Sequence, residues 1–380
     1  MDETLNNSFG APADPTLTCH SALPPAPPGT ERPAAGRYVL GEEIARGGMG
    51  IVYRATDTTF DRPVAIKVLL RGGSSSGAAR RFADEARITG QLQHPAIPPV
   101  HDLGTLPDGT PFLAMKLIKG NTLERLLKDR PDPAAGRGRL VAAFEQICQA
   151  VAYAHDHRVI HRDLKPANVM VGGFGEVQVM DWGLAKVLDA KEANAANPEA
   201  TAAGTLVRSI RDSDDDQTQA GSVLGTPAFM PPEQALGSVG KVDARSDVFG
   251  LGGILAAILT GQPPFASGSV ETTRIKAAQG KVEECFARLD ASGGDPELVA
   301  LCKRCLAPEP DGRPANGGEV AEAVAALRQA GGRTGATGGT GPRPRRGGPE
   351  KEAFATDPVG CGSSLIRDGR RGGDGDLPVA

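Results

Sequence analysis

His161-Arg-Asp-Leu-Lys-Pro-Ala-Asn168 is the stretch of this 380-residue sequence that carries the most chemistry in the fewest residues. It places a carboxylate (Asp163), an ammonium (Lys165) and an amide (Asn168) on one short loop. Asp163 can accept a proton from an attacking hydroxyl, Lys165 can neutralise phosphate charge, and Asn168 can hold a metal ion. The stretch therefore favours phosphoryl-transfer chemistry.

A second oxygen ligand follows at Asp181-Trp-Gly183, 18 residues after Asp163. The short apolar runs between them can form strands that fold this aspartate back toward the loop. A carboxylate, an amide oxygen and substrate phosphates are hard ligands, which favours Mg²⁺, with Mn²⁺ as an alternative.

Upstream, the sequence offers a phosphate-binding hairpin and a buried lysine. Glycines at Gly47, Gly48 and Gly50 let backbone N–H groups approach phosphate oxygens, although any tight hairpin can be glycine-rich. Lys67 ends an apolar run, and a lysine buried there needs an anionic partner. Glu85 is the natural candidate, the alternative being a solvated helix face.

Hydrophobic periodicity divides the patterned stretch into two parts. The first third alternates with period two, which predicts strands; they are Tyr38–Leu40, Ile51–Tyr53, Val64–Leu69 and Pro111–Met115. One helix, Ala79–Leu92, interrupts them. From Leu123 on, apolar residues recur at helical spacing, with short strands between the helices. The predicted helices are Leu140–His155, Ser246–Leu259, Val270–Gln279, Pro296–Cys305 and Gly318–Arg328. The predicted short strands are Val159–Ile160, Val169–Val171 and Val177–Met180. This order predicts an α+β fold with two lobes.

Glycine and proline, 50 and 31 residues, are unevenly distributed along the chain. They gather in a Pro-rich leader (1–36) and a Gly/Arg-rich tail (329–380), both of which we expect to be disordered. A stretch rich in Ala, Asp, Ser and Thr (189–224) is too long for an ordinary loop and is predicted to be a mobile insertion. The folded unit is thus predicted to span 37–328.

Composition excludes several functional classes. The net charge of −4 provides no basic excess for binding nucleic acid, and the arginines of the tail favour a solvated spacer. No apolar run reaches the ~18 residues of a membrane span, and the N-terminus is not a secretory signal. Six scattered cysteines do not form a disulfide framework, so we expect a cytoplasmic, reducing compartment.

In order along about 290 residues, these motifs resemble the protein kinase family, in its bacterial Ser/Thr branch. The strings that carry the resemblance are Val64-Ala-Ile-Lys67, His161–Asn168, Gly225-Thr-Pro227, Pro231-Pro-Glu233, Asp243–Gly250 and Asp311-Gly-Arg-Pro314. The resemblance implies a bilobal kinase fold, with an N-lobe at 37–117 and a C-lobe at 118–328.

The resemblance also implies an ATP site and roles for individual residues. The nucleotide-binding residues would be Ile44, Ala45, Arg46, Gly47, Gly48, Met49, Gly50, Val52, Ala65, Lys67, Glu85, Met115, Lys116 and Ile118. Lys67 would contact the phosphates and pair with Glu85, and Asp163 and Lys165 would be catalytic, while Asn168 and Asp181 would bind the metal. Glu233 and Arg313 would form a buried ion pair, and Asp247 would brace the catalytic loop.

The sequence departs from the family pattern at three places. Ala45 replaces the first glycine of the Gly-rich loop, Trp182 replaces a phenylalanine, and Lys116 stands where an acidic residue is common. None removes a group that does chemistry. The alternative to an active kinase is a catalytically silent ATP-binding pseudokinase scaffold, for which Ala45, Trp182 and the 189–224 insertion are the only arguments.

An activation mechanism is also implied. Arg162, beside the catalytic aspartate, favours a phosphate on the segment between Asp181 and Glu233. We expect autophosphorylation at Thr218 or Ser222, the alternative being hydroxyls that merely keep a loop soluble. Protein substrates with Ser or Thr acceptors and a transient dimer for trans-autophosphorylation are the expected partners, and no nucleic acid is expected.

Three smaller features favour structural interpretations. Cys302 and Cys305 have the spacing of half a zinc site, but their place on an apolar helix face favours buried core thiols. His155 and His157 are predicted to be charges at a helix C-terminus, not ligands. His94-Pro95 is predicted to form a turn.

Overall fold

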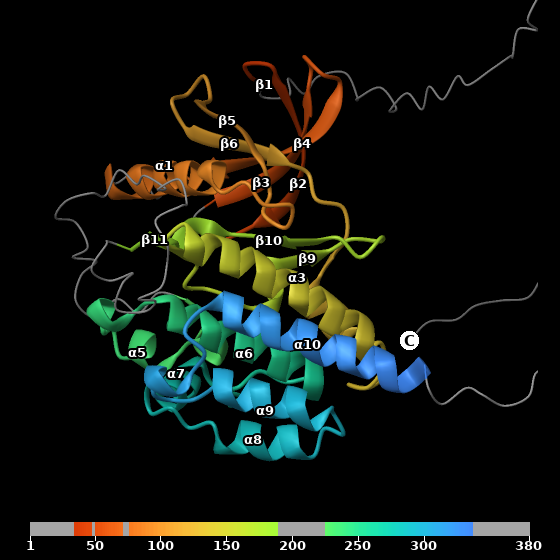
Figure 1. Cartoon of the computed structure of the whole chain (residues 1–380). Coiled ribbons are helices and arrows are strands. Elements are labelled where there is room, and N and C mark those ends of the chain that lie inside the picture. The colour runs from red at the N-terminus through yellow and green to blue at the C-terminus, as the bar shows by residue number, and fades with distance from the viewer. Residues whose placement is uncertain (1–33, 48–49, 71–75, 189–224, 337–380) are drawn as a thin grey trace, which may run out of the picture. The chain divides into compact units, whose positions relative to one another are not determined.

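The computed structural model describes residues 34–47, 50–70, 76–188 and 225–336, whose helices and strands are labelled in Figure 1. Gly48 and Met49, the predicted insertion 189–224 with Thr218 and Ser222, most of the predicted leader and most of the predicted tail lie outside the described residues.

The first part of the chain forms a six-stranded antiparallel sheet with the strand order β1-β2-β3-β4-β6-β5. Its strands are β1 (Ala34–Ala35), β2 (Tyr38–Arg46), β3 (Gly50–Asp57), β4 (Arg62–Leu69), β5 (Val100–Thr105) and β6 (Pro111–Lys116). Tyr38, Leu40, Val64, Ile66 and Phe112 pack together on one face of the sheet. Since β4 has a partner on each edge, its Val64-Ala65-Ile66 segment is buried throughout and holds the neighbouring Lys67 in place.

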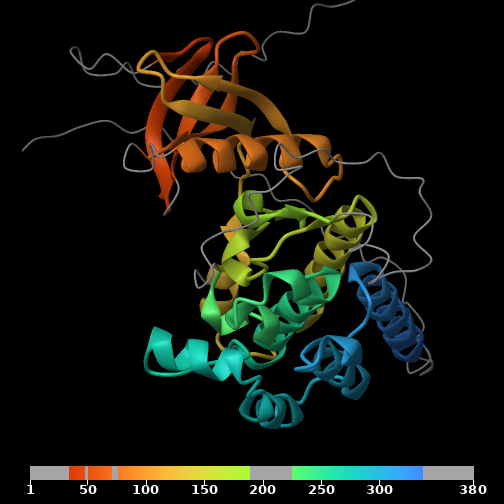
Figure 2. The same cartoon turned by 90° about the vertical axis from the view of Figure 1, so that its left-hand side faces the viewer.

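Helix α1 (Ser76–Gln91) packs against this sheet, as Figure 2 shows. Its Phe82 and Ala86 meet Leu69 and Leu113 in a small apolar cluster. The same helix carries Glu85, so the packing of α1 determines where that carboxylate lies.

The second part is mainly helical, with two small sheets near the catalytic loop. The strands are β7 (Asn121–Thr122), β8 (Val159–Ile160), β9 (Val169–Val171), β10 (Val177–Val179) and β11 (Lys186–Val187). The α-helices are α2 (Leu123–Lys128), α3 (Arg137–Asp156), α5 (Pro232–Ala235), α6 (Ala244–Thr260), α7 (Val270–Ala278), α8 (Glu283–Asp290), α9 (Pro296–Cys305) and α10 (Gly317–Ala336). Short 3₁₀ turns are η2 (Pro166–Asn168), η3 (Trp182–Leu184), η4 (Pro227–Phe229), η5 (Val239–Lys241) and η6 (Pro310–Gly312).

Helix α6 is the centre of the helical part. The side chain of Asp243 caps its first turn by accepting from the Arg245 backbone N–H, and Gly261 ends it at φ 78°. Nearly every residue of α6 is buried. Gly252 lets helix α9 approach closely, because a methyl group there would lie 2.7 Å from Cys305 Cβ. This central helix presents Asp247 to the catalytic loop.

The α+β prediction is confirmed, and the predicted strands and helices are present. The strands β1, β5, β7 and β11 and the helices α2, α5 and α8 were not among the predicted elements; the residues of β5 are mostly half-exposed or exposed, without alternation. β1 lies inside the predicted leader, and α10 continues eight residues past the predicted end at 328. Once α10 is anchored on α3, each added residue gains a backbone hydrogen bond, which carries the helix through Gly331 and Gly332.

No helix in the described part of the chain is long and apolar enough to cross a membrane. The longest apolar run, Val248–Leu259, forms the interior of helix α6, and all of its residues are buried.

Candidate active site

The catalytic loop is held in place by one buried carboxylate from α6. Asp247 is 2% exposed, and its oxygens accept hydrogen bonds from the backbone N–H groups of His161 (2.7 Å) and Arg162 (2.8 Å). Arg162 has a left-handed backbone (φ 66°), which is costly for a non-glycine residue. The predicted bracing role of Asp247 is therefore seen directly: it stabilises a turn that the loop would not adopt alone.

Asp163 is held from three directions. Its Oδ1 accepts from the Thr226 N–H (3.1 Å), while Oδ2 accepts from Lys165 Nζ (2.6 Å) and Asn168 Nδ2 (3.2 Å). Lys165 Nζ also donates to Thr226 Oγ1 at 2.6 Å. The Asp163 side chain remains 11% exposed, so the carboxylate is fixed in orientation without being sealed from solvent.

Asn168 and Asp181 provide oxygen donors suited to a metal ion. The Asn168 amide nitrogen donates to both the backbone oxygen (2.9 Å) and the side chain of Asp163, which leaves its amide oxygen as an acceptor. The Asp181 side chain is 53% exposed. Among the described residues, no group of three or more His, Cys, Asp or Glu side chains forms a metal-binding cluster. Two hard oxygen donors fit magnesium completed by phosphate oxygens and water.

Lys67 lies between two carboxylates from different parts of the chain. Its Nζ is 2.6 Å from Glu85 Oε1, which confirms the predicted ion pair, and 3.5 Å from Asp181 Oδ1. The lysine side chain is 12% exposed and that of Glu85 is 5% exposed. The ammonium is thus nearly desolvated, paired with Glu85 and directed toward Asp181.

Electrostatics keep this lysine charged. Burial opposes the charge of Lys67, but the negative charges of Glu85 and Asp181 outweigh it and raise the pKa of Lys67. Asp181 is half-exposed; its partial burial would raise its pKa, but the positive charge of Lys67 lowers that pKa below its ordinary value. A charged Lys67 and an ionised Asp181 therefore coexist at neutral pH.

The glycine-rich hairpin joins β2 to β3. The Gly47 N–H donates to the Gly50 carbonyl at 2.9 Å, which closes the turn. Ile44, Ala45 and Arg46 end β2, and Arg46 pairs with Glu43 at 2.6 Å. Ala45 lies opposite Val52 in the strand pairing, directly after an irregularity in the register between Glu43 and Ala45.

The remaining predicted nucleotide-binding residues lie on β4 and β6 and just beyond them. Ala65 is 5% exposed and lies opposite Met115 in the register of these strands. Lys116 ends β6, and Ile118 follows in the connection to β7. The strands thus bring Ala65 and Met115 side by side, next to Lys67.

Trp182, which stands where the family has a phenylalanine, packs in the interior. It is 2% exposed and packs on the His161 ring, with 4.7 Å between ring centroids. Its indole N–H donates to the Val179 carbonyl at 3.0 Å, a bond that phenylalanine could not make.

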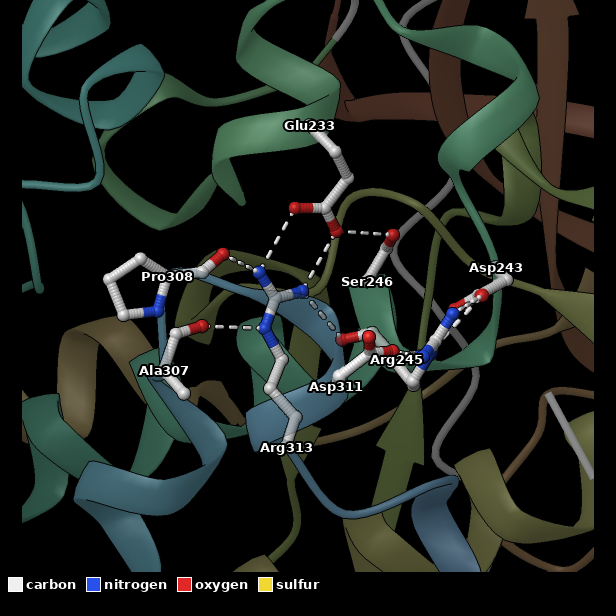
Figure 3. Close-up of polar contacts among 8 residues, drawn as sticks. All are labelled: Glu233, Asp243, Arg245, Ser246, Ala307, Pro308, Asp311 and Arg313. Atoms are coloured by element: carbon white, nitrogen blue, oxygen red, sulfur yellow. Dashed lines mark hydrogen bonds and ion pairs between the residues drawn. The ribbon is translucent and has the colours of Figure 1, made fainter.

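The predicted Glu233–Arg313 ion pair is present and buried (Figure 3). Arg313 Nη1 and Nη2 donate to the two oxygens of Glu233 at 2.8 and 3.0 Å. Ser246 Oγ donates to the same carboxylate at 2.7 Å. This network fixes α5, the helix that follows the Thr226 segment.

Sequence reasoning missed His155. Its Nε2 lies 3.0 Å from Asp247 Oδ2, and its Nδ1 accepts from the Gly317 N–H (3.1 Å), so it connects α3, α6 and α10. His155 does lie in the last turn of α3, as predicted, but the sequence did not indicate these buried partners, which lie 92 and 162 residues away. His157 does lie at the end of α3, where Nδ1 is 2.8 Å from the Tyr153 carbonyl.

Two smaller predictions are confirmed. Cys302 and Cys305 are fully buried, and burial raises the pKa of Cys305 to about 12. The His94-Pro95 turn follows α1, with the Ala96 N–H donating to His94 Nδ1 at 3.1 Å.

A sheet-rich part that supplies a lysine–glutamate pair, and a helical part that supplies an aspartate loop, together define a protein of the kinase class. The chain belongs to the protein kinase family: the family described as "Protein kinase domain" matches residues 38–326, about three quarters of the sequence. The predicted family is confirmed.

Similar relatives are bacterial serine/threonine-protein kinases. PknB of Mycolicibacterium smegmatis is 36% identical over 289 residues, covering 75% of this chain and 42% of PknB. RqkA of Deinococcus radiodurans, described as DNA damage-responsive, is 35% identical over 309 residues, covering 80% of this chain and 41% of RqkA. PknD of Protochlamydia amoebophila is 37% identical over 248 residues, covering 62% of this chain and 24% of PknD. The chain thus spans less than half the length of these relatives.

Proposed function

We propose that the chain is an ATP-dependent serine/threonine kinase that transfers the γ-phosphate of ATP to hydroxyl groups of protein substrates. The observation that supports this most strongly is the fixed Asp163 carboxylate with Lys165 and Thr226 around it. Family membership and the names of the similar relatives agree with it.

Asp163 would orient the acceptor hydroxyl and accept its hydrogen bond, because its position is fixed before substrate binds. Lys165 would hold developing phosphate charge next to that hydroxyl. Lys67 would position the phosphates, and its own position is already set by Glu85. Such preorganised charge is the main contribution a protein makes to phosphoryl transfer.

Asn168 and Asp181 would hold Mg²⁺, or Mn²⁺ in its place. When bound, the ion supplies charge neutralisation for the phosphate oxygens. The Asn168 amide also keeps Asp163 in place through its nitrogen, so one side chain links the metal site to the catalytic carboxylate.

The test is transfer of radiolabel from ATP to a generic Ser/Thr substrate and to the chain itself, with Mg²⁺, with Mn²⁺ and with EDTA. We expect labelling with either ion and none with EDTA. Asp163→Asn should lose at least about a thousand-fold in kcat while ATP binding persists. The matched control is Asp156→Asn, an exposed aspartate seven residues upstream. A wild-type protein that labels nothing would refute the proposal.

The pseudokinase alternative is less well supported. It predicts no effect of Asp163→Asn on labelling, since there would be none. Ala45 pairs with Val52 between β2 and β3 and Trp182 is buried in a packed position, so neither departure removes a reacting group.

We further propose autophosphorylation between copies of the chain in a transient dimer, with Thr218 or Ser222 as acceptors. Arg162, whose side chain donates to the Leu184 carbonyl, is the residue that supports a phosphate-responsive segment. Phosphopeptide mapping after incubation with Mg-ATP tests this, and modification found only outside 201–222 would contradict it.

A cytoplasmic location is part of the proposal, because ATP is available there and the described cysteines are free thiols.

A further inference from the structure

Gln178 is a buried polar residue without a role in the proposed chemistry. It lies on β10, is 4% exposed, and donates through Nε2 to the Pro95 carbonyl at 2.6 Å. Its Oε1 is buried and makes no hydrogen bond with any described residue. An apolar side chain would avoid the desolvation of that oxygen, so core stability alone does not account for a glutamine here.

The bond joins two segments that are distant in sequence. β10 is the edge strand of its sheet, and its Val179 N–H donates to the Ala96 carbonyl at 2.7 Å. With the Gln178 bond, Pro95 and Ala96 are therefore attached twice to β10. We call these two hydrogen bonds the 95–178 joint.

Each side of the joint leads to a carboxylate that contacts Lys67. Pro95 follows α1, which carries Glu85, and Gln178 lies three residues before Asp181. Lys67 Nζ contacts both carboxylates, at 2.6 Å (Glu85) and 3.5 Å (Asp181). The two segments that carry Glu85 and Asp181 are therefore linked at two points, at Lys67 and at the 95–178 joint. The distance between Glu85 and Asp181 then depends on whether the hydrogen bonds of the joint are made.

Trp182 extends the joint to the metal ligand. Its indole donates to the carbonyl of Val179, the same residue whose N–H is bonded to Ala96. Asp181 lies between Val179 and Trp182 and has a left-handed backbone with φ 62°. A conformation of this kind persists only where its surroundings enforce it.

We propose that Gln178 is a positioning residue that sets the distance between Glu85 and Asp181 around Lys67. It acts through the 95–178 joint and touches neither substrate nor phosphate.

The chain provides its own probe, because Trp182 is its single tryptophan. Gln178→Met removes the donor with little change in size, and Gln178→Glu removes it without changing the shape. Gln146→Met is the matched control, because Gln146 also donates through Nε2 to a backbone carbonyl, that of Gly175, at 3.1 Å, away from Asp181.

In the full-length chain we expect both Gln178 variants to shift the emission of Trp182 to longer wavelength, while Gln146→Met leaves it unchanged. The kinetic expectation rests on the proposed function: kcat falls roughly three- to ten-fold, and the Mg²⁺ concentration for half-maximal rate rises. KM for the protein substrate stays constant, because the contacts of Asp163 with Thr226 and Lys165 are untouched.

The outcomes separate the two proposals. If the wild-type protein transfers no phosphate, the proposed function fails. The fluorescence emission of Trp182 then still tests whether the 95–178 joint holds the segment around Asp181 in place. Gln178 variants that match Gln146→Met in emission overturn the inference. If the wild type is active, Gln178 variants whose Trp182 emission changes while their kcat equals that of the wild type also overturn it. Failure of both Gln178 variants to fold overturns it as well.

Discussion

Asp247 carries a negative charge in a fully enclosed position. Burial would raise the pKa of Asp247, but the hydrogen bonds from His155 and the loop backbone outweigh it, and the pKa is lowered. A carboxyl whose pKa is lowered on folding stabilises the folded state above its ordinary pKa of about 3.9. That contribution is lost as the pH falls through the lowered folded value.

We therefore expect Asp247→Asn to lower the free energy of unfolding at pH 7 and to flatten its dependence on pH below about 4. Urea denaturation of wild type and variant across acid pH measures this. Asp156→Asn is the exposed control and should lose stability below about pH 4 as the wild type does. If Asp247→Asn also lost stability there as the wild type does, another group would be responsible for the pH dependence of the free energy of unfolding.

The Arg313–Glu233 pair is a second prediction at this scale. Arg313 is fully buried, so Arg313→Met leaves Glu233 charged and unpaired, at a cost of about 3–5 kcal/mol in stability. Glu233→Gln combined with Arg313→Met should recover part of the loss. Denaturation curves measure both, and Arg274→Met, which breaks an exposed pair with Glu271, should leave stability unchanged. Equal losses in the single and double variants would contradict this account.

At the scale of elements, the glycines of the hairpin separate into structural and ligand-facing positions. A methyl group on Gly50 would lie 2.6 Å from the Val68 carbonyl of the neighbouring strand, while one on Gly47 would meet nothing within 4 Å. The sequence-based interpretation treated both as phosphate-binding residues. The space around them assigns Gly50 to strand packing.

Gly50→Ala should therefore lower stability by about 1–3 kcal/mol, because the β3–β4 pair must move apart. Gly47→Ala should leave the melting temperature unchanged and weaken ATP binding. Thermal unfolding without nucleotide and titration with nucleotide give the two readings. Equal melting temperatures for the two variants would remove the distinction.

Elements were predictable where apolar residues recur with a clear period or form a continuous run. α3 and α9 bury residues at helical spacing, while β4 and α6 are marked by apolar runs that are buried almost throughout. β5 was missed because its edge position leaves most of it half-exposed or exposed.

The site was predictable to the extent that a residue's chemistry demands a partner. A lysine in an apolar strand requires an anion, which led to Glu85. Nothing in the sequence indicates that Gln178 binds the carbonyl of Pro95, 83 residues away, since any buried carbonyl accepts such a bond. Contacts of this kind depend on how the elements pack.

At the scale of the whole molecule, α10 completes the fold. Val320 and Val324 are fully buried, and Arg328 pairs with Glu145 on α3. A chain shortened to 34–336 should melt at the temperature of the full chain, whereas one ending at residue 316 should melt on the order of 10 °C lower. Calorimetry distinguishes them; equal melting temperatures would show that α10 contributes nothing to the core.

The bond from Gly317 to His155 also has a consequence for the order of events during synthesis. Lys67, Asp163 and Asp181 leave the ribosome early. The supporting contacts of Gly317 with His155 and of Arg313 with Glu233 span 162 and 80 residues, so they form only later in synthesis. Because synthesis proceeds from the N-terminus, an unfinished chain holds Lys67, Asp163 and Asp181 without these later contacts. Translation itself would thus delay the assembly of the candidate site until the helical part is complete, and a chain released early would lack that arrangement.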